Sequence, residues 1–213
     1  MDSKAHWETI YKTKRPDEVS WFQREATISL ALIRRIAPKS TSAIIDVGGG
    51  ASTLVDGLLA TGYRNVSVLD VSSTALAEVR RRLGRAGADV SWLEADVLGA
   101  DLPQAAFDVW HDRAVFHFLT AEADRARYVA QARRAVRPGG YALVATFAHD
   151  GPTHCSGLPV ARYTSSALHQ EFGVGFRLLE SVREEHLTPS GARQAFVYCL
   201  CEVQATASTN VAA

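Results

Sequence analysis

The chain has 213 residues, with 23 basic and 23 acidic side chains and a formal net charge of +0. Its apolar fraction of 47% is ordinary for a globular protein, and its length fits a single domain with a sizeable core. The balanced charge offers no electrostatic footprint for nucleic acid or for an anionic membrane, so we expect neither partner. Only three cysteines, no apolar leader and no run of about 18 apolar residues predict a cytoplasmic protein.

Hydrophobic periodicity predicts that helices and strands alternate after an aromatic N-terminal segment. Continuous apolar runs bounded by turn residues indicate strands, and apolar residues on one face of a helical repeat indicate helices. In chain order, the expected elements are a helix over Ala26–Ile36, a strand over Ala43–Val47, a helix over Thr53–Leu59, a strand over Asn65–Asp70, a helix over Ser73–Leu83, strands over Val90–Glu94 and Phe107–His111, a helix over Ala121–Val136, a strand over Tyr141–Phe147, a helix over Ser165–Phe172, and strands over Arg177–Leu187 and Gln194–Val203.

This alternation predicts an α/β fold with a doubly wound, mostly parallel sheet of seven strands. Thr188-Pro189-Ser190-Gly191 is a turn by composition, so the last two strands are expected to form an antiparallel C-terminal hairpin at the sheet edge. Right-handed crossovers place a ligand crevice at the carboxyl ends of the first two strands. We treat residues 1–213 as one domain, with an N-terminal helical lid (1–40), a core (41–203) and a flexible tail (204–213).

A glycine-rich turn follows the first strand, in the stretch Asp46-Val47-Gly48-Gly49-Gly50-Ala51-Ser52. Glycine suits a backbone that turns sharply and approaches a ligand closely, because a Cβ atom would block both. Asp70 ends the second strand 20 residues after Gly50, where a carboxylate can accept the hydroxyls of a ribose. A tight strand-to-helix connection would explain the glycines alone. The strand, glycines, helix and spaced acid together favour a nucleotide or nucleoside crevice.

Three features argue against a dinucleotide or a phosphate-binding loop. Thr53 stands where the Gly-x-Gly-x-x-Gly fingerprint has its third glycine. No lysine follows Lys39, so the chain lacks the Tyr and Lys pair that a short dehydrogenase commonly places on a helix. No Gly-Lys-Ser/Thr follows the turn, which excludes a P-loop.

Four motifs resemble those of class I S-adenosylmethionine-dependent methyltransferases, over roughly residues 7 to 203. They are the glycine turn after Asp46, the acid Asp70, the stretch Glu94-Ala95-Asp96-Val97 and the turn Val136-Arg137-Pro138-Gly139-Gly140. Ser52 stands at the last glycine of the first motif and can cap the following helix. The resemblance implies a Rossmann-like core, S-adenosylmethionine as the cofactor and S-adenosylhomocysteine as its product.

The resemblance also implies roles for individual residues. Asp46 is expected near the methionine amino group, Asp70 on both ribose hydroxyls and Asp96 on the adenine amine. The backbone of the glycine turn is expected to cradle the cofactor. The full set of expected cofactor-binding residues is Trp21, Asp46, Gly48, Gly49, Gly50, Asp70, Val71, Asp96, Val97 and His111.

His111 and Asp112 are the expected catalytic residues, because related enzymes place substrate-facing groups just after the fourth strand. Methyl transfer from a sulfonium mainly requires alignment and exclusion of water, so a base is needed only for a protonated acceptor. His111 is the candidate base, since histidine titrates near working pH. A local ion pair between Asp112 and Arg113 and a packed histidine at His117 are the alternatives.

Two further segments border the expected acceptor site. Similar enzymes use an aromatic N-terminal segment as a lid over the methionine end of the cofactor. Trp7 and Tyr11 share a helix face here, and Trp21 is the residue for which a lid role is favoured. Docking of a helix on the core is the alternative. The loop over residues 149–159 follows the fifth strand and is a natural substrate loop.

We therefore expect a methyltransferase that acts on a small-molecule nucleophile, such as a thiol, a metalloid, or an oxygen or nitrogen atom, as a monomer or homodimer. A protein lysine methyltransferase is the alternative, because the segment over residues 7–22 also resembles enzymes that modify a translation factor. A non-catalytic cofactor-binding module is the third possibility. Cys199 and Cys201 could bind a soft ion with Cys155, but small core residues are the favoured interpretation and no metal site is expected.

Overall fold

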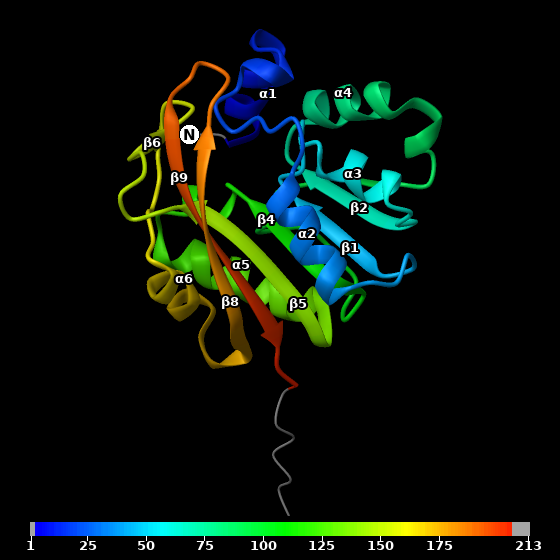
Figure 1. Cartoon of the computed structure of the whole chain (residues 1–213), viewed down its shortest axis with the longest axis vertical. Coiled ribbons are helices and arrows are strands. Elements are labelled where there is room, and N and C mark those ends of the chain that lie inside the picture. Colours follow the sequence, from blue (N-terminus) through cyan, green and yellow to red (C-terminus); the bar gives the residue numbers. More distant parts are fainter. Residues whose placement is uncertain (1–2, 206–213) are drawn as a thin grey trace, which may run out of the picture.

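The computed structural model describes residues 3–205 and shows a mixed seven-stranded sheet with helices on both faces (Figure 1). The strand order is β3-β2-β1-β4-β5-β9-β8; β9 is antiparallel to both of its neighbours, and the other pairs are parallel. This confirms the predicted fold class. The helices are α1 (Ser3–Thr13), α2 (Thr27–Ile36), α3 (Leu54–Ala60), α4 (Ser73–Leu83), α5 (Glu122–Ala135) and α6 (Ser165–Phe172). The strands are β1 (Ala43–Val47), β2 (Asn65–Asp70), β3 (Ser91–Glu94), β4 (Phe107–Arg113), β5 (Val136–Phe147), β6 (His154–Cys155), β7 (Leu158–Pro159), β8 (Phe176–Leu187) and β9 (Arg193–Val203).

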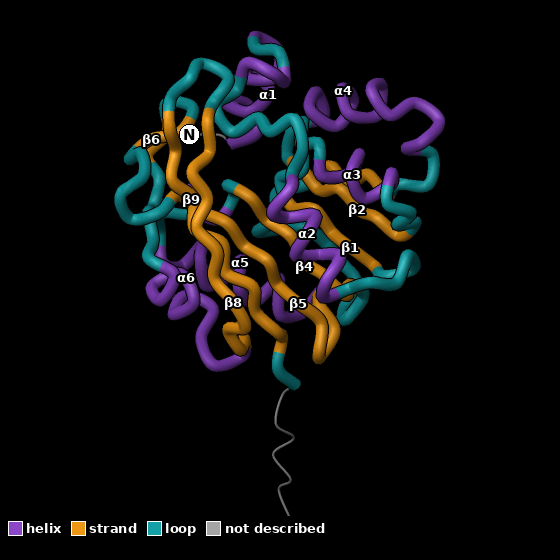
Figure 2. Tube along the Cα trace, viewed as in Figure 1, coloured by secondary structure: helices purple, strands orange, loops and turns teal. Residues whose placement is uncertain are grey.

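The sheet separates two apolar layers, as expected when helices cover both faces of parallel strands (Figure 2). One layer joins the sheet to α5 and α6 and includes the buried Tyr128 and Leu168. The other joins it to α2, α3 and α4 and includes Ile33, Leu58 and Val79. The central strand β1 is buried along its whole length. The carboxyl ends of β1, β2 and β4 therefore extend from a well-packed core.

The turn predicted between α5 and the fifth strand lies inside the strand instead. α5 ends at Ala135 and β5 begins at once with Val136, but the next residue of β5 in register with β4 is Tyr141. The residues between them form a bulge, because Pro138 has no N–H to donate and Gly139 adopts a φ of +75°. The motif thus shapes the entry into β5 without ending the sheet.

Two other boundaries differ from the expectation. β4 continues to Arg113 rather than ending at His111, because its last two residues still pair with β5. The segment predicted as a loop after β5 contains a short hairpin, β6–β7, in which Cys155 pairs with Leu158. Both differences place additional side chains near the carboxyl ends of the central strands.

The N-terminal helix α1 docks on the start of α4 through Glu8. The Glu8 carboxylate accepts hydrogen bonds from Ser73 Oγ at 3.1 Å, from the Thr74 N–H at 3.3 Å and from Thr74 Oγ1 at 2.5 Å. The Thr74 bonds lower the pKa of Glu8 to about 2, against the effect of burial. A carboxylate at a helix N-terminus also meets the positive end of the helix dipole. Lys4 adds an ion pair to Glu94 at the end of β3, at 2.5 Å.

The cysteines lie on opposite faces of the sheet. Cys199 and Cys201 are buried in the layer of α5 and α6, whereas Cys155 belongs to the other layer. No cluster of three His, Cys, Asp or Glu side chains within residues 3–205 could hold a metal ion. The interpretation of Cys199 and Cys201 as core residues is confirmed.

Within the same range, the search for a membrane-spanning helix finds no segment with the required length and apolarity. Residues 206–213, which make up most of the predicted flexible tail, lie outside the described residues.

Candidate active site

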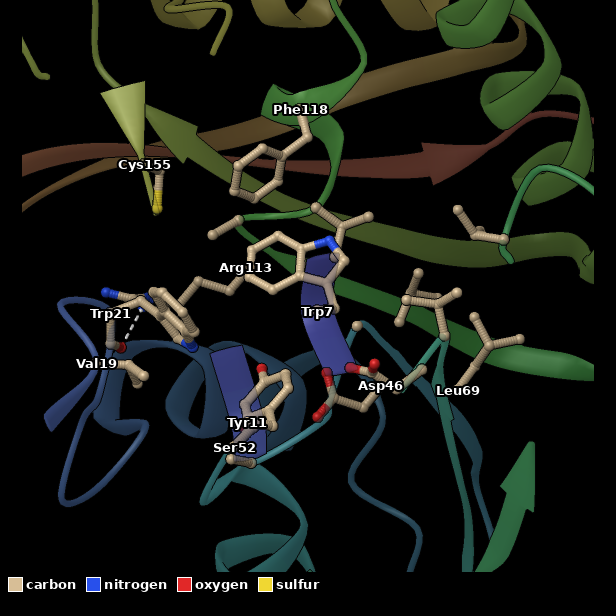
Figure 3. A pocket seen from close by; sticks show the side chains of 18 of the residues that line it. Trp7, Tyr11, Val19, Trp21, Asp46, Ser52, Leu69, Arg113, Phe118 and Cys155 are labelled. Carbon is tan, nitrogen blue, oxygen red and sulfur yellow. Dashed lines mark hydrogen bonds between the residues drawn. The ribbon is translucent and has the colours of Figure 1, made fainter. Parts of the chain in front are cut away.

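A cavity of about 670 Å³ opens at the carboxyl ends of β1, β2 and β4. Its volume falls within the roughly 300–1,000 Å³ that is typical of small-molecule sites. The strand ends and the loops after them form one side of the cavity, and α1 with the segment over residues 16–23 forms the other (Figure 3). The cavity lies where the parallel topology predicts a ligand crevice.

Asp46, near the end of β1, lines this cavity and has one unpaired carboxylate oxygen. The side chain is almost fully buried, and its Oδ1 is 2.6 Å from His111 Nδ1. Its Oδ2 has no hydrogen-bond partner within the described part of the chain. A buried carboxylate oxygen without a donor is costly. The site is therefore suited to a ligand that brings an N–H donor, as the amino group of a methionine moiety would.

His111 holds this carboxylate in place. Its Nδ1 faces Asp46, and its Nε2 lies 2.8 Å from the hydroxyl of Ser29 on α2. With an ionised Asp46, the neutral ring donates from Nδ1 and accepts the Ser29 hydroxyl at Nε2. Both ring nitrogens are thus engaged, so the geometry favours a positioning role for His111 over its predicted role as a base. Ser29 had no signal in the sequence beyond its place on an apolar helix.

Asp70 ends β2 beside the same cavity. Its Oδ1 accepts the N–H of Ser72 at 2.8 Å. Burial raises the pKa of Asp70 to about 7, although backbone N–H groups of Ser72, Gly50 and Val71 act in the opposite direction. Hydroxyl donors from a bound ribose would favour the charged form. The site therefore fits a nucleoside, whose binding would stabilise the ionised carboxylate of Asp70.

The glycine turn makes room for these two carboxylates. An added Cβ at Gly49 would lie 2.6 Å from Asp46 Oδ2, and one at Gly50 would lie 2.5 Å from Asp70 Oδ2. Gly48 lines the cavity at a φ of +65°. The second and third glycines thus stand behind the acids rather than in the cavity wall, so their contact with the ligand is indirect.

Most of the predicted cofactor residues share this cavity. Those that line it are Trp21, Asp46, Gly48, Asp70, Val71, Asp96, Val97 and His111. Asp96 also accepts the N–H of Leu98 at 2.9 Å, which orients its carboxylate after β3.

Asp112 faces away from the cavity, and the structure does not support its predicted catalytic role. Successive residues of a strand point to opposite faces, so His111 and Asp112 cannot both reach the crevice. The Asp112 carboxylate accepts the N–H groups of Val115 at 2.8 Å and Phe116 at 3.0 Å, and the Tyr128 hydroxyl. Burial raises its pKa to about 6. The alternative ion pair with Arg113 is also absent, because Arg113 pairs with a different acid.

His117 is a packed core residue. It is fully buried, its Nδ1 accepts the Phe147 N–H at 3.3 Å, and burial lowers its pKa to about 3. It does not line the cavity, so the alternative of a packed histidine is the one that the structure favours.

The other end of the cavity is aromatic. The rings of Trp7 and Phe118 lie 5.0 Å apart, and those of Trp7 and Trp21 lie 5.8 Å apart, each pair edge to face. Cys155 and Arg113 complete this chamber, which lies beside the cofactor-type residues (Figure 3). Sequence reasoning missed Phe118, whereas Arg113 belongs to the segment after the fourth strand that was expected to border the acceptor. Arg113 follows His111 by two positions on a strand, a spacing that puts both side chains on one face.

Residues 44–140 match the family model described as a methyltransferase domain. An uncharacterized methyltransferase of Mycobacterium bovis is 32% identical over 121 residues, which cover 55% of this chain and 56% of the relative. The chain thus spans about half the length of that relative. The eEF1A lysine and N-terminal methyltransferase of Danio rerio is 24% identical over 70% of this chain but only 22% of its own length.

One solved structure has the same fold over nearly the whole chain. It is the 1,6-didemethyltoxoflavin-N1-methyltransferase of Burkholderia thailandensis, crystallised with 1,6-didemethyltoxoflavin and S-adenosylhomocysteine. It aligns with a TM-score of 0.74 and 19% identity, and covers 95% of this chain and 87% of that protein. At this identity the likeness concerns the fold. The fold, the motifs and the family match over residues 44–140 together support a methyltransferase domain of the class I S-adenosylmethionine-dependent type. The cofactor of this family is S-adenosylmethionine, and the free oxygen of Asp46 and the carboxylate of Asp70 fit it.

Proposed function

We propose that the protein transfers the methyl group of S-adenosylmethionine to a small-molecule nucleophile bound in the aromatic chamber. The observation that carries this proposal is the continuity of one cavity, with the cofactor-type acids at one end and a chamber beneath the N-terminal segment at the other. The cavity volume suits a cofactor together with a small acceptor.

S-adenosylmethionine supplies a methyl group on a positively charged sulfur; the acceptor forms the new bond to carbon while the carbon–sulfur bond breaks and its electron pair stays on sulfur. Asp46 would hold the methionine end of the cofactor and Asp70 its ribose, and His111 and Ser29 fix the orientation of Asp46. Trp7, Trp21 and the neighbouring rings exclude water. Alignment of this kind contributes several kcal/mol to catalysis without a dedicated acid or base.

A protein lysine methyltransferase is the competing proposal, and the Danio rerio relative favours it. The chamber argues against it, because α1 and residues 16–23 form part of its wall and leave less room for a polypeptide at the reacting end. A non-catalytic module would bind the cofactor but form no product.

The deciding experiment measures S-adenosylhomocysteine formed from S-adenosylmethionine by mass spectrometry. The protein is offered a panel of thiols, phenols, amines and arsenite, and separately lysine-containing peptides and purified eEF1A. Asp46→Asn, which weakens the cofactor site, serves as the control. Turnover with a small molecule and none with peptides supports the proposal. Turnover with peptides or eEF1A alone contradicts it, and cofactor binding without any turnover favours the non-catalytic module.

A further inference from the structure

The aromatic chamber contains one permanent cation. Among the described residues that line the cavity, Arg113 is the only lysine or arginine, and its side chain is only 8% exposed. Around it stand aromatic and apolar side chains, including Trp21, Phe118 and Cys155 (Figure 3). A buried guanidinium in such a wall is costly unless its hydrogen-bonding capacity is used.

The protein holds this guanidinium in a fixed orientation. Arg113 Nε donates to the Tyr198 hydroxyl at 2.9 Å, Nη1 to the carbonyl of Trp21 at 3.0 Å, and Nη2 to Glu184 Oε2 at 3.3 Å. Its plane lies over the ring of Phe196, with Cζ 4.1 Å from the ring centroid. An arginine restrained in this way presents its remaining donors as a rigid fork, the geometry that suits a carboxylate.

The charge of Arg113 is only partly compensated. Glu184 does not line the cavity, and its carboxylate also accepts the Tyr198 hydroxyl at 2.7 Å and the side-chain amide of Gln23 at 2.6 Å. Three of the five N–H groups of the guanidinium have acceptors among residues 3–205. Two N–H groups therefore remain for a ligand.

The acidic residues that line the cavity belong mainly to its cofactor end. Asp46, Asp70 and Asp96 occupy the positions of the cofactor motifs, and Asp124 pairs with Arg127 on the surface of α5. No carboxylate among the described lining residues stands beside Arg113 within the chamber. The cavity is thus polarised, with its acids at the cofactor end and its one permanent cation at the acceptor end.

The surroundings of Cys155 also include this cation. Burial raises the pKa of the Cys155 thiol to about 11, whereas hydrogen bonds with Ser156 and Ser20 and the charges of Arg113 and Lys14 lower it. The neighbouring groove between α1 and α4 adds little net charge, because Lys12 pairs with Glu8, Arg15 with Asp17 and Arg81 with Glu78. The inference therefore rests on Arg113.

We propose that the methyl acceptor carries a carboxylate next to an aromatic or apolar body, and that Arg113 is the residue that selects it. The inference rests on the proposed function and names its substrate class. It concerns recognition of the acceptor and leaves the methylated atom open. A protonated lysine side chain would meet a like charge at Arg113, so the same residue disfavours a lysine acceptor.

The test measures binding to the protein loaded with S-adenosylhomocysteine, by calorimetry and by intrinsic tryptophan fluorescence. The probes are matched pairs: benzoate and benzamide, phenylacetate and phenylacetamide, indole-3-acetate and indole-3-acetamide. The acid should bind roughly tenfold more tightly than the amide in at least one pair, a factor that corresponds to about 1.4 kcal/mol.

The variants are Arg113→Lys and the double variant Arg113→Met with Glu184→Gln, which leaves no unpaired buried acid. Arg64→Met, at an exposed position, is the charge-matched control. Arg113→Lys should keep part of the acid preference, the double variant should lose it, and the control should keep all of it. Affinity for S-adenosylhomocysteine should stay near wild type in every variant.

The possible outcomes separate the two proposals. If no acid is preferred in any pair, or if the double variant retains the preference, Arg113 does not select a carboxylate and this inference is wrong, whereas the proposed function stands. If S-adenosylhomocysteine itself does not bind to the wild-type protein, the proposed function fails first.

Discussion

The two ends of the cavity are built in different ways. At the cofactor end, short acids at the ends of adjacent parallel strands, Asp46 and Asp70, meet a glycine turn close in sequence. At the acceptor end, side chains converge from α1, from the segment over residues 16–23, from β4 and the turn after it, and from the β6–β7 hairpin. They are Trp7, Trp21, Arg113, Phe118 and Cys155. Backbone geometry determines the structure of the cofactor end, whereas the packing of side chains from distant segments determines that of the acceptor end. Changes at one end should therefore be separable from changes at the other.

The largest expected effect follows replacement of Asp70. Asp70→Asn should weaken binding of both S-adenosylhomocysteine and 5′-methylthioadenosine, which lacks the amino-acid moiety, by about 3 kcal/mol, since charge-assisted hydrogen bonds contribute about 1.5–3 kcal/mol each. Calorimetry measures both affinities, with the exposed Asp101→Asn as the control. Unchanged affinity for both ligands in a folded variant would remove Asp70 from the ribose site.

The pH dependence of Asp70 offers a second measurement on the same residue. Its pKa is raised from 3.8 to about 7, so the folded protein binds a proton that the unfolded chain releases between these values. Stability from this group is present below about pH 4 and decreases as pH rises toward 7. Cofactor affinity should increase over the same range, because hydroxyl donors favour the carboxylate. Asp70→Asn should remove its own share of both profiles, while Asp112, with a pKa raised to about 6, and His117, with a pKa lowered to about 3, keep their shares of the stability profile.

Replacement of Asp46 should distinguish binding of the methionine end of the cofactor from binding of its nucleoside part. Asp46→Asn should weaken binding of S-adenosylhomocysteine by about 1.5–3 kcal/mol, because the free oxygen is lost as a charged acceptor. The affinity for 5′-methylthioadenosine should stay nearly unchanged. Equal losses for the two ligands would show that the variant disturbs the whole site rather than the methionine end.

A smaller effect is expected at Ser29, which lines the cavity and is hydrogen-bonded to His111. Ser29→Ala removes a neutral hydrogen bond, so the affinity for S-adenosylhomocysteine should fall by about 0.5–1.5 kcal/mol. The affinity for 5′-methylthioadenosine should again stay nearly unchanged. His111→Asn should follow the same selectivity with a larger loss. If turnover of an identified acceptor falls far more than cofactor affinity in His111→Asn, the histidine acts as a base after all.

The smallest expected effect concerns the lid. Glu8→Gln should loosen α1 by about 0.3–1 kcal/mol, the usual size of a charge interaction at a helix N-terminus. Hydrogen exchange in α1 should accelerate while the core stays protected. The pKa of Glu8 is lowered to about 2, so its contribution is complete above about pH 4.5 and is lost as pH falls through 2. Exchange rates in α1 that do not change on substitution would contradict a role for Glu8 in docking.

The sequence brought most residues of the expected cofactor end into one cavity because the information at this end is local. A strand, a glycine turn and an acid at the end of the next strand occur together within about thirty residues, so this combination can be recognised from the sequence alone, as with dinucleotide and nucleoside motifs in general. It predicted the acceptor end poorly. His111 and Asp112 were both assigned to the crevice, although the twofold repeat of a strand allows only one of them to face it. Arg113 was placed in the segment expected to border the acceptor, but its contacts with Tyr198 and Glu184 could not be predicted, because they come from the distant C-terminal hairpin.

The N-terminal segment is attached to the molecule at two places that behave differently. Residues 20–23 are fixed by buried or half-buried groups, with Arg113 on the carbonyl of Trp21 and His186 on that of Ser20 at 2.8 Å. The helix α1 is held at its surface, through Glu8 and Lys4. Exchange of spent for fresh cofactor thus calls for undocking of α1, which carries Trp7 out of the acceptor chamber, while Trp21 and Arg113 stay in place. Mutations on α1 and α4 that loosen this docking should therefore change the rate of turnover, and mutations around Arg113 should change the choice of acceptor.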